Sequence, residues 1–236
     1  MNFEVYGNGE EVIFLHGWGQ SLETFYPIKK YFSNNKIYLV DLPGFGKSRN
    51  PEEYNLDYYV AILRKFIIEN KINNPIILGH SFGGRIAIKY SSIYNVKKLI
   101  LVNSAGIIHH GFKYKVKVFL YKFFKKIGIK INMGSSDYKN CNDELKKVLV
   151  SVTNESLIDA MKKIEAQTLL IYGSNDQITP VADAKLIEGY IRNSALVIIP
   201  NAAHFSYLDN PIYFALVLES FLMSDIKWSY YYRYII

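Results

Sequence analysis

Short apolar runs alternate with longer mixed segments over most of the chain, at the spacing of an α/β protein. The runs after the first two are rich in Val, Ile and Leu and lack polar alternation, which is typical of parallel strands covered on both faces. The first two are separated by Gly7-Asn8-Gly9, and we expect them to form a hairpin. The pattern predicts strands over Phe3–Tyr6, Val12–Leu15, Ile37–Val40, Ile76–Leu78, Leu99–Val102, Leu169–Tyr172 and Leu196–Ile199.

Apolar residues recur at helical spacing between these runs, which predicts helices over Leu56–Glu69, Gly84–Ser92, Pro180–Ile191 and Pro211–Met223. Between residues 107 and 165 no strand is evident. An apolar stripe from Phe112 to Ile127 has lysines on its opposite side, and a second helix is predicted over Asp143–Val152. We therefore expect an α/β core of residues 1–106 and 166–225, with helices on both faces of a mostly parallel sheet. Residues 107–165 form an inserted helical lid, and 226–236 form an aromatic tail.

Composition adds a compartment and a charged region to this picture. Half of the 236 residues are hydrophobic, no apolar run is long enough to span a membrane, and no signal peptide is evident. A single cysteine, Cys141, excludes an intramolecular disulfide, so we expect a soluble cytoplasmic protein. The net charge of +7 comes from the segment between Lys113 and Lys147. Its lysines could contact an anionic membrane or an acidic carrier protein, or simply face solvent. We expect no nucleic-acid partner.

The segment Gly79-His80-Ser81-Phe82-Gly83 follows a predicted strand and precedes a predicted helix. A Gly-x-Ser-x-Gly turn in that context is typical of a nucleophile elbow, in which the serine projects above the sheet beside the amides of the new helix. Serine is a poor nucleophile unless a base lies within hydrogen-bond reach and is itself oriented by a carboxylate. Ser81 is therefore the candidate nucleophile, and the chain should supply a histidine and an acid for it.

The partners of an elbow serine follow it in the order acid, then histidine, each in a loop after a strand. His204 follows the strand predicted over Leu196–Ile199, and Asp176 follows the strand before it. Asn103, not a carboxylate, ends the strand predicted over Leu99–Val102, which leaves Asp176 as the acid. Taken singly, His204 could be an ordinary loop histidine and Asp176 a turn or capping residue. No spaced His, Cys and Asp set predicts a metal site, and the reaction needs no cofactor.

Acyl transfer also needs donors for the oxyanion that forms on the carbonyl oxygen. The Phe82 amide, directly after the candidate nucleophile, should be one donor. The Trp18 amide, in the glycine-flanked loop after the strand at Val12–Leu15, should be the other. We expect the side chains of Trp18 and Phe82 and those of the lid residues Phe119 and Phe123 to contact substrate, although Trp18 could instead be a core aromatic.

These motifs resemble the α/β-hydrolase superfamily: His16–Gly19, Asp41–Ser48, Gly79–Gly84, Asp176 and His204 occur in its order, over Val12 to Met223. The chain is similar to small carboxylesterases, among them pimeloyl-acyl-carrier-protein methyl esterases, and to carbon–carbon bond hydrolases of aromatic-ring degradation. A serine at the elbow differs from the aspartate of dehalogenases and epoxide hydrolases. The resemblance implies a serine hydrolase that cleaves a small-molecule ester through an acyl-enzyme. Carbon–carbon hydrolysis, thioester hydrolysis and peptide hydrolysis stay open, as does a receptor that binds a ligand without turnover.

Overall fold

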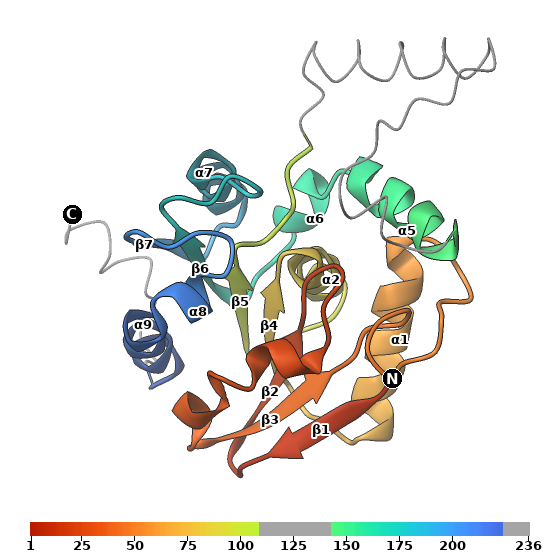
Figure 1. Ribbon diagram of the computed structural model, residues 1–236, viewed down its shortest axis with the longest axis horizontal. Helices are drawn as coiled ribbons and strands as arrows, with labels where there is room; N and C mark the ends of the chain where they lie inside the picture. The colour runs from red at the N-terminus through yellow and green to blue at the C-terminus, as the bar shows by residue number, and fades with distance from the viewer. Residues whose placement is uncertain (109–142, 224–236) are drawn as a thin grey trace, which may run out of the picture.

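The structure, a computed structural model, describes residues 1–108 and 143–223 (Figure 1). Its strands are β1 (Phe3–Tyr6), β2 (Glu10–Leu15), β3 (Asn35–Val40), β4 (Ile76–His80), β5 (Lys98–Val102), β6 (Gln167–Gly173) and β7 (Ser194–Ile199). Its helices are the 3₁₀ turns η1 (Leu22–Phe25) and η2 (Lys29–Phe32) and the α-helices α1 (Leu56–Glu69), α2 (Phe82–Ser91), α5 (Asp143–Asn154), α6 (Ile158–Met161), α7 (Val181–Tyr190), α8 (Ser206–Asp209) and α9 (Pro211–Met223).

The strands form one seven-stranded sheet in the order β1-β3-β2-β4-β5-β6-β7. All neighbouring pairs are parallel except β1 and β3. Every residue of β4 and β5 is buried, as the absence of polar alternation in these segments predicted. The prediction of an α/β fold with a mostly parallel sheet is confirmed. Because β2, β4, β5, β6 and β7 run the same way, the loops after them open at one edge of the sheet.

The predicted hairpin is wrong. β1 pairs antiparallel with β3, from Phe3 opposite Val40 to Tyr6 opposite Ile37, and β2 lies on the other side of β3. The connection between β1 and β2 passes close to the backbone of Asn35, where only glycine fits. A Cβ at Gly7 would lie 2.3 Å from the Asn35 carbonyl oxygen, and both Gly7 and Gly9 have positive φ. Burial also favours this order, because the last four residues of β2 are buried whereas β1 is half-exposed and suits an edge.

Helices cover both faces of the sheet, as expected, and each face has its own hydrophobic core (Figure 1). On one face, α1, α2, α6 and α7 pack against residues such as Ile13, Leu101 and Tyr172. On the other face, η1, η2, α8 and α9 pack against the alternate residues, among them Phe14 and Val102. Successive side chains of a strand point to opposite faces, so one apolar strand supplies both cores.

The described part of the predicted lid is fixed to the core. Helix α5 contains the helix predicted over Asp143–Val152, and it buries Leu145, Val148 and Val152 in the same cluster as α1 and α2. The Leu145 side chain lies against Gly44, where an added Cβ would be 2.6 Å from it. Residues 109–142 of the predicted lid and 224–236, with the predicted tail, lie outside the described residues. The division into core, lid and tail therefore stays a prediction.

Helix α9 is apolar on nearly all sides. Its inner residues, such as Phe214 and Phe221, are fully buried, while Ile212, Leu216 and Met223 are exposed. Within residues 1–108 and 143–223, no helix is both long and apolar enough to cross a membrane.

Candidate active site

The elbow forms where β4 runs directly into α2. Ser81 has φ 50° and ψ −110°, a conformation that L-residues rarely adopt, as the elbow prediction requires. The helix begins at Phe82, two residues before the predicted start, because the turn is complete at Ser81. The flanking glycines allow backbone contact: a Cβ at Gly79 would lie 2.6 Å from the Gly83 carbonyl oxygen, and one at Gly83 would lie 2.1 Å from that of Leu15.

Backbone hydrogen bonds fix the elbow from three sides. The Ser81 amide donates to the Val102 carbonyl (3.1 Å), and the Ala105 amide donates to the Ser81 carbonyl (3.1 Å), so both bonds run to the end of β5 and the loop after it. The Gly83 amide donates to the His16 carbonyl (3.1 Å), which joins α2 to the loop after β2. The Phe82 amide is the first of the helix, so the helix itself supplies no acceptor for it. That amide, directly after Ser81, remains the candidate oxyanion donor.

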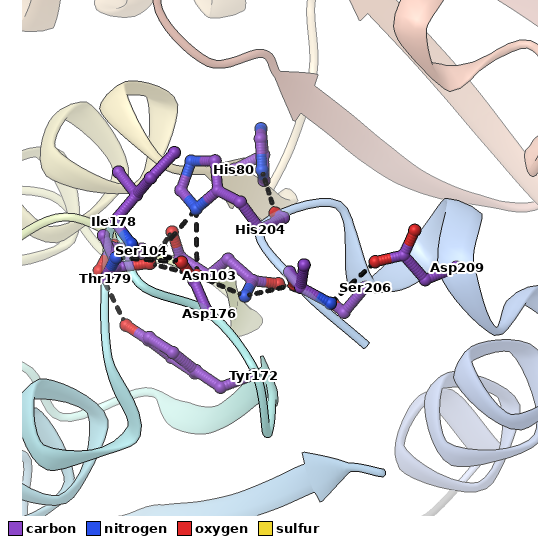
Figure 2. Close-up of polar contacts among 11 residues, drawn as sticks. His80, Asn103, Ser104, Tyr172, Asp176, Ile178, Thr179, His204, Ser206 and Asp209 are labelled. Atoms are coloured by element: carbon purple, nitrogen blue, oxygen red, sulfur yellow. Dashed lines mark hydrogen bonds and ion pairs between the residues drawn. The ribbon is translucent and has the colours of Figure 1, made fainter. Parts of the chain in front are cut away.

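The predicted acid and base meet at the same edge of the sheet (Figure 2). His204 Nδ1 lies 2.9 Å from Asp176 Oδ2, although the two residues are 28 apart in sequence. Asp176 is 5% exposed and His204 9%. With its proton on Nδ1 and donated to the carboxylate, the imidazole keeps a free electron pair on Nε2, which is the form a general base needs.

The Asp176 carboxylate is saturated with donors. Its Oδ1 accepts from the amides of Ile178 (2.8 Å) and Thr179 (3.0 Å). Its Oδ2 accepts from His204 Nδ1, from the Thr179 hydroxyl (2.6 Å) and from Asn103 Nδ2 (2.7 Å). Burial alone would raise the pKa of Asp176, but the bonds from His204, Thr179 and Asn103 outweigh it and hold the pKa well below its usual range. The carboxylate therefore stays ionised while it is buried.

His80 joins the elbow to the loop after β7 that carries His204, the base loop. Its Nε2 lies 2.9 Å from the His204 carbonyl oxygen, to which it donates, and the two imidazole rings are 4.9 Å apart. Burial, followed by the neighbouring His204, lowers the pKa of His80 to about 3, so the ring is neutral. The residue after it is Ser81, so this bond ties the loop of His204 to the elbow. The sequence did not predict this role of His80. The only signal for it was the position of His80 between Gly79 and Ser81.

The loop after β2 carries the second candidate oxyanion donor. His16 accepts from the Leu42 amide through Nε2 (3.0 Å), and its Nδ1 lies 2.8 Å from the Gly17 carbonyl oxygen. Burial lowers the pKa of His16 to about 4, so it supports this loop as a neutral ring. The Trp18 indole packs edge-on against Phe82 at 5.3 Å, so it is partly a core aromatic.

The predicted contacts to substrate divide into described and undescribed residues. The Phe82 side chain is only 4% exposed and packs on Tyr59 and Trp18. The part of Phe82 that the site can use is therefore its backbone amide. Phe119 and Phe123 lie outside the described residues. Ile178, which the sequence did not single out, follows the acid in the same loop and is 70% exposed.

The turn Asp41–Ser48 has a structural role. The Asp41 carboxylate accepts from the amides of Leu22 and Lys47 (2.8 Å each). Gly46 passes so close that an added Cβ would lie 2.2 Å from the carboxylate carbon. The two bonds of the Asp41 carboxylate therefore hold this turn to the first residue of η1. In the described part of the chain, no group of three or more His, Cys, Asp or Glu side chains could hold a metal ion.

Comparison with known proteins agrees with this fold. A family model described as alpha/beta hydrolase fold matches residues 11–126. A pimeloyl-[acyl-carrier protein] methyl ester esterase of Wigglesworthia glossinidia brevipalpis is 29% identical, over 93% of this chain and 96% of its own. A 2-hydroxy-6-oxo-6-(2'-aminophenyl)hexa-2,4-dienoic acid hydrolase of Metapseudomonas resinovorans is 28% identical, over 92% and 85%. The structure of an esterase from Exiguobacterium antarcticum matches with a TM-score of 0.76 and 25% identity, over 94% of this chain and 95% of its own.

The fold, the family model and the relatives point the same way. The sheet is mostly parallel, and the relatives match nearly the whole chain. The predicted resemblance is confirmed: the chain is an α/β-fold hydrolase, similar to small carboxylesterases and to carbon–carbon bond hydrolases.

Proposed function

We propose that the protein is a serine esterase that works through an acyl-enzyme. Ser81 Oγ attacks the ester carbonyl carbon while its proton passes to His204 Nε2, and Asp176 holds the imidazole and stabilises its charged form. The amides of Phe82 and Trp18 stabilise the tetrahedral oxyanion. The proton then goes to the departing alcohol oxygen, which leaves an ester on Ser81. Water repeats these steps on that ester, releases the acid and restores Ser81.

The observation that carries this proposal is the bond between His204 Nδ1 and Asp176 Oδ2, in a loop that His80, the neighbour of the strained Ser81, reaches through the His204 carbonyl. Burial of a charge is costly unless other groups compensate it. A chain that only bound a ligand would gain nothing from a buried, ionised carboxylate behind a histidine. The site thus supports turnover over a receptor role.

Ester hydrolysis is the chemistry we favour among those that share this machinery. The esterases of Wigglesworthia and Exiguobacterium carry that activity in their names. The exposed Ile178 and the partly buried Trp18 support an apolar acyl group as the substrate. Initial rates on p-nitrophenyl esters from acetate to decanoate test this, and rates that do not depend on acyl length would contradict it. We keep a cytoplasmic location as part of the proposal, because a single cysteine excludes an intramolecular disulfide.

The decisive variant is Ser81→Ala. We expect it to abolish hydrolysis of p-nitrophenyl butyrate and covalent labelling by a fluorophosphonate. Ser151→Ala, on α5, is the matched control and should keep both. Labelling or turnover that survives in Ser81→Ala would remove the proposal.

A further inference from the structure

Asn103 occupies the point where the elbow and the base loop meet the loop after β6 that carries Asp176, the acid loop. It directly follows β5, is fully buried, and has φ 43°, a conformation that asparagine tolerates better than most residues. Its backbone amide donates to the Ile171 carbonyl on β6 (2.9 Å), so the backbone at this position is tied to the sheet. The side chain is therefore held beside the acid loop with little freedom.

Every polar atom of the Asn103 side chain has a partner in the site (Figure 2). Nδ2 donates to Asp176 Oδ2 at 2.7 Å, and it also lies 3.2 Å from the carbonyl oxygen of Ala203, the residue before His204. Oδ1 accepts from the Ser206 hydroxyl at 2.5 Å. Because the hydroxyl donates to Oδ1, it fixes the amide so that Nδ2 faces the carboxylate.

The Asn103 amide touches the same carboxylate oxygen that receives the histidine proton. Oδ2 of Asp176 lies 2.7 Å from Asn103 Nδ2 and 2.9 Å from His204 Nδ1. An aspartate side chain can rotate about its own bonds, and its orientation is set by the donors around it. A neutral donor at this place keeps the oxygen directed at the imidazole and adds no charge to the buried site.

We propose that Asn103 is a positioning residue of the hydrolase: it orients the Asp176 carboxylate toward His204 and ties the acid loop to the base loop. This inference rests on the proposed function, because it assigns Asn103 a part in activating Ser81 through two other residues. Asn103 itself, being fully buried behind Asp176, contacts no substrate.

The test measures the rate of Ser81 labelling by a fluorophosphonate, together with kcat and KM on p-nitrophenyl butyrate. Asn103→Ala should lower the labelling rate and kcat by about tenfold or more, within the share of the rate that general-base catalysis supplies. KM should stay within about twofold. Asn201→Ala is the matched control, because Asn201 also has positive φ (59°) and lies in the loop before His204, but is exposed. It should label like the wild type.

A double-mutant comparison separates positioning from a general structural role. In an Asp176→Ala background, Asn103→Ala should cause no further loss of labelling rate, since the residue through which it acts is gone. Asn103→Asp provides a second variant in case Asn103→Ala does not fold. It keeps the shape and the acceptor for Ser206 but turns a carboxylate oxygen toward Asp176, so the same loss is expected at neutral pH.

The outcomes are distinct. A wild-type protein that the fluorophosphonate does not label would overturn the proposed function and this inference with it. A labelled wild type whose Asn103→Ala and Asn103→Asp variants react equally fast would overturn the positioning role alone. So would an equal loss in the Asp176→Ala background, or failure of both variants to fold, because each assigns Asn103 to the fold and not to Asp176.

Discussion

The two sides of the candidate active site are held in place by different means. On the Ser81 side, backbones pack against each other where side chains are absent: the hypothetical Cβ of Gly83 lies 2.1 Å from the Leu15 carbonyl oxygen. On the His204 side, side chains are fixed by hydrogen bonds that converge on one carboxylate, Asp176. The first arrangement tolerates no added atom but depends on few polar groups. The second should accept changes of shape more readily, yet lose function when one donor or one charge is removed.

The largest effect should come from Asp176→Asn, on the hydrogen-bonded side. The amide keeps the shape but no longer stabilises the charged imidazole or selects its tautomer, so kcat should fall on the order of 10⁴-fold. Asp209→Asn is the control, because Asp209 Oδ2 accepts from the Ala203 amide (2.7 Å) in the same region, without contact to the imidazole. Its kcat on p-nitrophenyl butyrate should stay within about threefold of the wild type. Similar losses in the two variants would contradict the special role of Asp176.

On the close-packed side, Gly83→Ala should act on stability. The new methyl group meets backbone that cannot move without disrupting β2, so we expect a loss of about 3 kcal/mol or more in the free energy of unfolding, measured in urea. Gly189→Ala, in α7 with no heavy atom within 4 Å of the added Cβ, should be neutral or stabilising by about 0.5–1 kcal/mol. Equal stability of the two variants would show that the elbow does not need its glycine.

Acid should weaken the Ser81 side, which holds His80 and His16, and the His204 side, which holds Asp176, in different pH ranges. His80 and His16, whose pKa values burial lowers to about 3 and about 4, take up protons first in the unfolded chain, near the ordinary value of 6.5. The free energy of unfolding should therefore fall as the pH drops below 6.5, by about 2 kcal/mol per histidine at pH 5. The pKa of Asp176 is lowered, so its contribution is present above the ordinary value of 3.8 and is lost only at more acidic pH.

Urea unfolding at pH 7 and pH 5 tests this difference. His80→Gln keeps a side-chain donor but cannot take up a proton, so its stability should change less between the two pH values, by about 2 kcal/mol. An unchanged pH dependence in His80→Gln would mean that His80 is not the neutral, buried group the structure describes.

The smallest effect should come from Ser206→Ala. This change removes the hydroxyl that donates to Asn103 Oδ1 and leaves a buried acceptor without that donor. We expect about 1 kcal/mol less stability and a few-fold lower kcat, with KM unchanged. A kcat as low as that of Asn103→Ala would mean that Ser206 contributes more than the orientation of one amide.

The sequence predicted the strands and the longer helices of the described core because these are recorded in local patterns, whereas the short helices η1, η2, α6 and α8 were not predicted. Buried parallel strands are short apolar runs. Helix α1 begins and ends, and α9 begins, where the spacing predicted. Strand pairing is not local. The turn Gly7–Gly9 looked like a hairpin, but its glycines serve the close passage beneath Asn35, and β1 pairs with β3.

The same distinction applies to the site. Ser81, Asp176 and His204 could be predicted because each follows a strand in a known order. The other donors to Asp176 could not be predicted: Asn103 is 73 residues away from it in sequence, and an asparagine after a strand indicates only that no acid is there. Contacts of this kind depend on which strands are neighbours, and β5 next to β6 became evident only in the sheet.

The most direct test of the account is whether His204 controls the reactivity of Ser81. A fluorophosphonate adduct should map to Ser81 by peptide mass spectrometry in the wild type, and His204→Ala should form it at least about 10²-fold more slowly while unfolding at the same urea concentration. An adduct on another serine, or equal rates in the two proteins, would contradict the proposal that these residues form one catalytic unit.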